Sequence, residues 1–154
     1  MGLEIERKFL VKDTWRPEGE GVPMKQGYVA GGGPLIVRVR TAGGRAFLTL
    51  KGRTEGVTRA EFEYDVPVED AEKILALAGG PLIEKTRYRV PFGAHTWEID
   101  VFAGANEGLV VAEIELARED EIFEHPPWLG AEVSDDPRYY NSNLAEHPFR
   151  TWKA

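Results

Sequence analysis

The sequence predicts a mainly β fold (α+β): an eight-stranded antiparallel β-barrel, closed into a tunnel, with a few helices packed outside. Two observations lead to this prediction. Short runs of residues alternate between charged and apolar side chains, which is the period of a β-strand. Turn-forming residues separate most of these runs at short intervals, as in an antiparallel meander. We assign residues 1–154 to a single domain.

Eight strands are expected. They cover residues 3–12, 22–30, 34–42, 45–52, 57–66, 82–91, 95–102 and 108–117. The clearest turn is Ala42-Gly43-Gly44, which joins two alternating runs and indicates a hairpin. Further turns are predicted at residues 31–34, 91–94 and 104–108, all of which contain glycine.

Helical periodicity is confined to three segments. Residues 67–78 begin with a proline, place apolar residues at helical spacing and end before Gly79-Gly80. A short helix is expected at 119–124 and a last helix at 137–146. Trp128 and Leu129, between these two, are expected to anchor the core.

Composition excludes several classes of protein. The net charge of −7 argues against a nucleic-acid partner, because such proteins normally carry a basic surface. There is no cysteine, which excludes disulfides, zinc–thiolate sites and thiol catalysis. The charged first residues do not resemble a signal peptide, and no apolar run is long enough to span a bilayer. We therefore expect a cytoplasmic protein without a membrane or nucleic-acid partner.

The charged strand faces carry like-signed pairs two residues apart. Eight acids and seven bases share these faces. The acids are Glu4, Glu6, Glu61, Glu63, Glu98, Asp100, Glu113 and Glu115, and the bases are Lys8, Arg38, Arg40, Lys51, Arg59, Lys85 and Arg87. A β-sandwich with this face in water is one interpretation, because charged faces are usually solvated. Repulsion within each pair favours the alternative, a barrel that turns its charges inward toward a ligand.

An interior of this composition is suited to a polyanion together with metal ions. Arginine binds phosphate oxygens in bidentate fashion, and lysine supplies a point charge. The carboxylates would repel phosphate unless Mg²⁺ or Mn²⁺ lay between them, since both ions accept oxygen ligands from carboxylates and phosphates. The pattern therefore predicts metal-assisted phosphoryl transfer.

The same residues resemble a known family. Glu4-Ile5-Glu6-Arg7-Lys8 is similar to the ExExK signature of the CYTH domain, or triphosphate tunnel metalloenzymes, in their short bacterial form. The later paired motifs follow in the family's order, and the resemblance spans essentially the whole chain. These motifs are Arg38-Val39-Arg40, Leu50-Lys51-Gly52, Arg59 to Glu63, Lys85 to Tyr88, Glu98-Ile99-Asp100, Glu113-Ile114-Glu115, Trp128 to Val133 and Arg138 to Leu144.

The resemblance implies a role for each charged group. Catalysis is expected from Glu4, Glu6, Lys8 and Lys51, with Lys51 as proton donor or stabiliser of the leaving group. The implied metal ligands, for one or two Mg²⁺ or Mn²⁺ ions, are Glu4, Glu6, Asp100, Glu113 and Glu115. The implied phosphate ligands are Lys8, Arg38, Arg40, Lys51, Arg59, Lys85 and Arg87. Supporting roles are assigned to Glu61, Glu63 and Glu98, with metal binding left open for the first two.

The expected function is a divalent-metal-dependent triphosphate hydrolase, with inorganic triphosphate as the first substrate. The family's shared motifs leave three alternatives open: an adenylyl cyclase of class IV type, a nucleoside or thiamine triphosphatase, and a non-catalytic binder of polyphosphate or nucleotide. The partner is then a small-molecule triphosphate, and either a monomer or a homodimer is compatible with the sequence.

Overall fold

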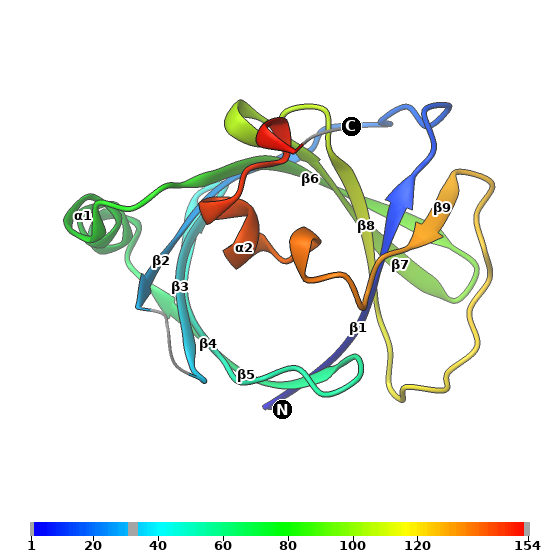
Figure 1. Ribbon diagram of the computed structural model, residues 1–154, viewed down its shortest axis with the longest axis horizontal. Helices are drawn as coiled ribbons and strands as arrows, with labels where there is room; N and C mark the ends of the chain where they lie inside the picture. Colours follow the sequence, from blue (N-terminus) through cyan, green and yellow to red (C-terminus); the bar gives the residue numbers. More distant parts are fainter. Residues whose placement is uncertain (1, 31–33, 153–154) are drawn as a thin grey trace.

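Nine strands in the described part of the chain form one antiparallel sheet that closes on itself (Figure 1). The computed structural model describes residues 2–30 and 34–152. The strands are β1 (Leu3–Val11), β2 (Val22–Ala30), β3 (Ile36–Ala42), β4 (Arg45–Lys51), β5 (Thr58–Val66), β6 (Ile83–Phe92), β7 (His95–Phe102), β8 (Val110–Glu115) and β9 (Leu129–Glu132). Eight of them make the barrel in the order β5-β4-β3-β2-β6-β7-β8-β1, and pairing of β5 with β1 closes the ring. The predicted eight-stranded antiparallel barrel is confirmed.

Strand β1 joins the two ends of the sheet. Its first residues pair with β5, with Leu3 opposite Ala60, while Glu6 to Leu10 pair with β8. Its last residues pair with β9, which lies outside the eight-stranded ring and was not predicted from the sequence. The alternation along β1 explains its charge pattern, because Glu4 and Lys8 are buried inside the barrel while Phe9 belongs to a core on the outside.

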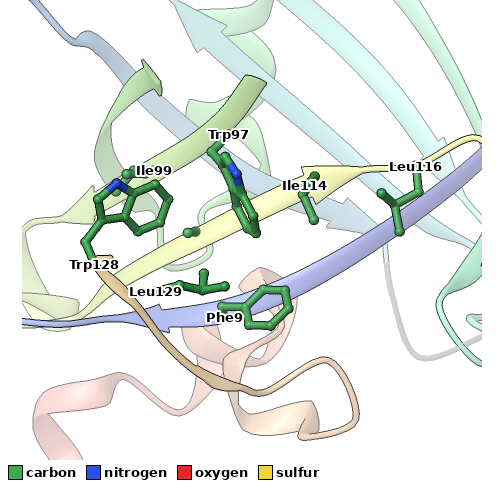
Figure 2. Packing of buried hydrophobic residues seen from close by; sticks show 8 residues of the cluster. Phe9, Trp97, Ile99, Ile114, Leu116, Trp128 and Leu129 are labelled. Atoms are coloured by element: carbon green, nitrogen blue, oxygen red, sulfur yellow. The ribbon is translucent and has the colours of Figure 1, made fainter. Parts of the chain in front are cut away.

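The largest apolar core covers the outer face of β1, β7 and β8 (Figure 2). Trp97 is fully buried there and makes edge-on contacts with the rings of Phe9, Phe123 and Trp128. Trp128 and Leu129 belong to this cluster, as predicted. The segment that supplies Phe123 is irregular instead of helical, so the predicted helix at 119–124 is wrong. Its aromatic contacts and Pro126-Pro127 hold it across the sheet without helical hydrogen bonds.

A second core lies beneath the helix α1 (Val68–Ala78), which packs on the outside of the ring against β2, β3 and β4 (Figure 1). Ala71 and Leu75 are its buried residues. The helix ends at Gly79, whose φ of 66° is the left-handed conformation that glycine adopts without strain. The predicted helix at 67–78 is therefore confirmed to within one residue.

The helix predicted at 137–146 is shorter than expected and lies at an end of the barrel. Pro137–Tyr139 form a 3₁₀ turn, the chain is extended at Tyr140, and the helix α2 covers only Asn141–Glu146. Its residues Leu144 and Ala145 pack against apolar side chains at one end of the barrel, chiefly those of Ile83, Phe102 and Val111. Each of those three lies two residues from an inward-facing charge on its own strand, so they face inward as well. Thus α2 covers an end of the tunnel instead of the outside, as Figure 1 shows.

The remaining sequence predictions agree closely with the structure. The hairpin at Ala42-Gly43-Gly44 connects β3 to β4, with Gly43 at a φ of 62°. The predicted turn at residues 31–34 lies largely outside the described residues. Within the described ranges, no helix is both long enough and apolar enough to cross a membrane.

Replacing Trp97 tests the outer core. Trp97→Ala should lower the free energy of unfolding by about 3–5 kcal/mol, because it removes a fully buried aromatic side chain and leaves a cavity. Urea unfolding followed by circular dichroism measures this. Leu77→Ala, at an α1 position that is 87% exposed, is the control and should change the value by less than about 0.5 kcal/mol. Equal effects of the two substitutions would contradict this account of the core.

Candidate active site

A cavity of about 460 Å³ occupies the inside of the barrel and is lined by nearly all the predicted site residues. A smaller pocket of about 40 Å³ beside it shares Glu4, Glu6, Lys8, Arg59 and Tyr140. Nine of the described side chains that line the larger cavity are cationic, and seven are carboxylates. The cations are Lys8, Arg38, Arg40, Arg45, Lys51, Arg59, Lys85, Arg87 and Arg89, and the carboxylates are Glu4, Glu6, Glu61, Glu63, Glu98, Glu113 and Glu115. Asp100 is the one predicted site residue that does not line the cavity, because it is buried behind other side chains.

The sign of the charge follows the order of the strands around the ring. Strands β4, β3, β2 and β6 follow one another around the ring. The lining residues of β2 are uncharged, and the other three strands contribute the cations Lys51, Arg38, Arg40, Lys85 and Arg87. Strands β7, β8, β1 and β5 contribute every carboxylate that lines the cavity. The tunnel therefore has a mainly basic wall facing a mainly acidic one. Lys8 on β1 and Arg59 on β5 are basic side chains within the acidic wall.

The two ends of the tunnel differ. At one end β3 meets β4 through the register pair Ala42 and Arg45, and the exposed side chains of Arg45 and Arg89 line the cavity there. At the other end the cavity meets Tyr140 and Asn141, which precede and begin α2. Apolar packing of α2 covers the β6, β7 and β8 side of this end. On the β1 and β5 side, a smaller pocket that includes Thr54, Ser134 and Tyr140 lies beside it. The tunnel is therefore exposed at the arginine end and partly covered at the α2 end.

The most tightly paired charges are on β6 and β7. Asp100 accepts two hydrogen bonds from Arg87, at 2.7 and 2.9 Å, and forms an ion pair with Lys85 Nζ at 2.7 Å. Burial raises the pKa of Asp100, but these two cations outweigh it and the net pKa is lowered. Burial lowers the pKa of Lys85 to about 7, against the opposing attraction of Asp100. In this arrangement Asp100 orients two cations toward the cavity.

Glu113 connects this cluster to β1. Its carboxylate lies 3.2 Å from Arg87 Nη2 and 3.4 Å from Lys8 Nζ. Burial raises its pKa, yet Lys8 and Arg87 hold the pKa well below the usual range, so Glu113 is ionised. Glu98 on β7 pairs with Arg87 on the adjacent strand β6 at 3.2 Å and also with the exposed Arg89.

A second cluster surrounds Lys51. Its Nζ lies 3.3 Å from Glu4 and 3.2 Å from Glu61, and Arg59 also donates to Glu4 at 3.2 Å. Burial raises the pKa of Glu4, but Lys51 and Arg59 outweigh this and lower it. The pKa of Lys51 is lowered by burial and by Arg38, which makes its proton easier to release.

Glu6 and Glu115 form no ion pair with any residue that the structure describes, unlike Glu61, which pairs with Lys51. They lie directly opposite each other in the register of β1 and β8. Burial together with Glu113 and Glu4 raises the pKa of Glu6 well above its usual value. Burial together with Glu4 and Glu98 also raises the pKa of Glu115. A cation bound between them would remove this penalty.

The basic wall retains unused hydrogen-bond donors. Arg38 contacts Thr49 and Glu63 through one terminal nitrogen, but its buried Nε has no partner in the described structure. Burial lowers the pKa of Arg40 to about 10, helped by Arg38 and Arg87, and its Nε donates to Gln26 at 2.7 Å. A buried donor without a partner is costly. Arg38 and Arg40 both line the cavity, where their guanidinium groups can bind acceptor atoms of a ligand.

Sequence reasoning missed several polar lining groups. Tyr28, Tyr140 and Asn141 reach the cavity, and the fully buried Gln26 lies behind them and bonds to Tyr28 and Asn141. These residues carry no charge, so the like-signed pattern does not mark them. The signal that could have indicated Gln26 is its inward position on β2, a strand without charged pairs.

Comparison with known proteins now decides the family. The family model of the CYTH domain matches residues 2–140. The chain belongs to the CYTH domain family. The resemblance inferred from the paired motifs is thereby confirmed, and membership implies dependence on a divalent metal ion.

Two curated relatives are similar over almost their full length. An inorganic triphosphatase of Acetivibrio thermocellus is 47% identical over 155 residues, covering 99% of both chains. An inorganic triphosphatase of Nitrosomonas europaea is 42% identical over 149 residues, covering 92% of this chain and 96% of the relative. The crystal structure of an inorganic triphosphatase matches with a TM-score of 0.66 and 38% identity, over 92% of this chain and 93% of the other.

Removing Asp100 tests its place beneath the basic wall of this CYTH domain. Asp100→Ala should lower the free energy of unfolding by about 3–5 kcal/mol, because Lys85 and Arg87 lose the carboxylate that compensates their burial. Asp65→Ala is the control, since its pair with Arg45 is exposed and is worth less than about 1 kcal/mol. Chemical unfolding of both variants measures the difference, and a small effect of Asp100→Ala would contradict the assignment.

Proposed function

We propose that this protein hydrolyses inorganic triphosphate to pyrophosphate and phosphate with the help of Mg²⁺ or Mn²⁺. The observation that carries the proposal is the tunnel with a mainly basic and a mainly acidic wall. The basic wall suits the oxygens of a linear polyphosphate. The names of both curated relatives and of the similar solved structure support the same substrate.

Charge balance supports the involvement of a metal ion. The described lining has a formal excess of only two positive charges, with nine cations and seven carboxylates. A triphosphate carries more negative charge than this, so the basic wall alone leaves the complex negative. Magnesium is commonly held by one or two carboxylates together with substrate phosphates. Glu6 and Glu115 fit this mode, because they face each other with raised pKa values and carry only oxygen donors.

The catalytic roles follow from position. A divalent cation supplies neutralisation of phosphate oxygens and lowers the pKa of water. Arg38, Arg40, Lys85 and Arg87 hold the phosphate chain on the basic wall, which fixes its orientation. Lys51, with its lowered pKa, is placed to donate a proton to the departing pyrophosphate or phosphate.

The remaining residues of the acidic wall orient these groups. Glu4 and Glu61 hold Lys51, and Glu113 holds Lys8 and Arg87. We keep Glu4 and Glu113 as metal ligands that would exchange some of these ion pairs for a cation. Asp100 remains a proposed metal ligand from the family resemblance, although its observed bonds all go to Lys85 and Arg87.

The assay for this function is phosphate release from inorganic triphosphate and from ATP in parallel, with Mg²⁺ and then with Mn²⁺. We expect rapid release from inorganic triphosphate and little from ATP, with none in the presence of EDTA. Cyclic AMP is assayed in the ATP reaction. Formation of cyclic AMP would replace the proposal with a cyclase, and inactivity on both substrates with either metal would refute a triphosphatase of this kind.

Two substitutions test the tunnel as the active site. Lys8→Ala and Glu4→Ala should each lower kcat/KM for inorganic triphosphate by about 100-fold or more, because each removes a group that acts on charge inside the site. Circular dichroism should show an intact barrel. Lys73→Ala, on the exposed side of α1, is the matched control and should leave turnover unchanged. Near-normal rates in both tunnel variants would place the reaction elsewhere.

Glu6→Gln tests the proposed metal position. The amide is nearly the same size but is a weaker ligand for a hard cation, so the Mg²⁺ concentration that gives half-maximal turnover should rise about 10-fold or more. Metal titrations of kcat at saturating triphosphate measure this. Glu72→Gln, at an exposed position of α1, is the control. An unchanged metal requirement with a lower kcat would show that Glu6 acts without binding metal.

A further inference from the structure

The side-chain amides at the α2 end of the tunnel have orientations that their hydrogen-bond partners determine. Arginine has no acceptor, so Arg40 Nε, 2.7 Å from Gln26, must face the amide oxygen Oε1. The amide nitrogen of Gln26 then points the other way. It lies 3.0 Å from the hydroxyl of Tyr28 and 3.4 Å from Oδ1 of Asn141.

The same argument fixes Asn141. Lysine also has no acceptor while it is protonated, and Lys85 Nζ lies 2.9 Å from Asn141 Oδ1. The oxygen of Asn141 therefore receives donors from both Lys85 and Gln26, and its Nδ2 is turned away from them. This nitrogen forms no hydrogen bond with any other described residue, although Asn141 lines the cavity.

The backbone that carries Asn141 is held in place. Leu144 and Ala145 of α2 are buried in the apolar cluster at the end of the barrel. Asn143 Nδ2 donates to Pro137 O at 2.7 Å. Lys8 Nζ donates to Tyr139 O at 3.2 Å and lies 5.6 Å from the centre of the Tyr140 ring. Asn141 is thus a fixed group at the α2 end of the site, with two N–H donors available for an anion.

We propose that Asn141 is a substrate-specificity residue that binds the unsubstituted terminal phosphate of the substrate where the tunnel ends. This inference rests on the proposed function and deepens it. A phosphate chain that enters from the Arg45 and Arg89 end meets Tyr140 and Asn141 at the α2 end of the cavity. A terminal phosphate without an organic group offers the most acceptor oxygens to the two donors of Asn141. Any substituent is therefore expected on the opposite end of the chain.

Three variants test this inference by calorimetric titration with inorganic triphosphate in EDTA, where no turnover occurs. Asn141→Ala removes the two donors and should weaken binding about 5-fold. Asn141→Asp still accepts from Lys85 and Gln26 but replaces the donors with an acceptor, and should weaken binding at least about 10-fold more. Ser142→Asp places the same charge on the adjacent lining residue and should be much milder. Glu146→Ala, exposed on α2, should bind like the wild type.

The order of the affinities of these variants for triphosphate distinguishes direct phosphate binding by Asn141 from a role in positioning Lys85. If Asn141 only positioned Lys85, aspartate would serve as well as asparagine, so binding by Asn141→Asp at or above the level of Asn141→Ala would overturn the proposal. Equal losses in Asn141→Asp and Ser142→Asp would also overturn it, since general repulsion would then explain both. Failure of the proposed hydrolysis is seen separately, as a wild-type protein that binds triphosphate in the calorimeter but releases no phosphate.

Discussion

Opposite charges held across the inside of one small barrel are the constraint on which the rest of this structure depends. Most of the buried cations on the basic wall are compensated by a carboxylate of another strand, as Asp100 compensates Lys85 and Arg87. Such pairs contribute little net stability, because the cost of desolvation is close to the gain from attraction. Their effect is to fix donors and acceptors in place before any ligand arrives, which is the arrangement that phosphoryl transfer requires.

Stability must therefore come from other parts of the molecule. Apolar clusters surround the charged interior on the outside and at one end. Trp97 and its aromatic neighbours pack outside β1, β7 and β8, α1 covers β2 to β4, and α2 fills the end beyond Asn141. Burial of these groups supplies the hydrophobic free energy that a barrel full of ions cannot provide. The α2 cluster serves both purposes, because the packing that stabilises α2 also places Asn141 in the lining of the cavity.

The barrel and most of its lining were predictable because a strand alternates strictly and the charges came in pairs. Every predicted site residue except Asp100 lines the cavity. The same alternation rule did not predict the packing of α2 inside the barrel. It assigns charged residues to the inside, whereas Ile83, Phe102 and Val111 occupy inward positions and are apolar. Helical spacing at 137–146 did not reveal the break at Tyr140, which depends on contacts with Lys8 that are distant in sequence. The uncharged Gln26 and Asn141 were missed as site residues because their importance lies in which neighbours they bond.

Repulsion within a strand is relieved by its neighbours, and this sets the chemistry of the tunnel. Arg38 and Arg40 repel each other along β3, and the uncharged lining of β2 supplies the oxygen of Gln26 to one of them. On the opposite wall Glu6 and Glu115 face each other with raised pKa values and no such relief. An anion alone would compensate the cations of the basic wall but would add to the repulsion between the carboxylates of the acidic wall. A cation alone would compensate the carboxylates but would add to the repulsion between the cations. A triphosphate bound together with a divalent cation satisfies both, so the two walls are complementary to the pair and to neither ion by itself.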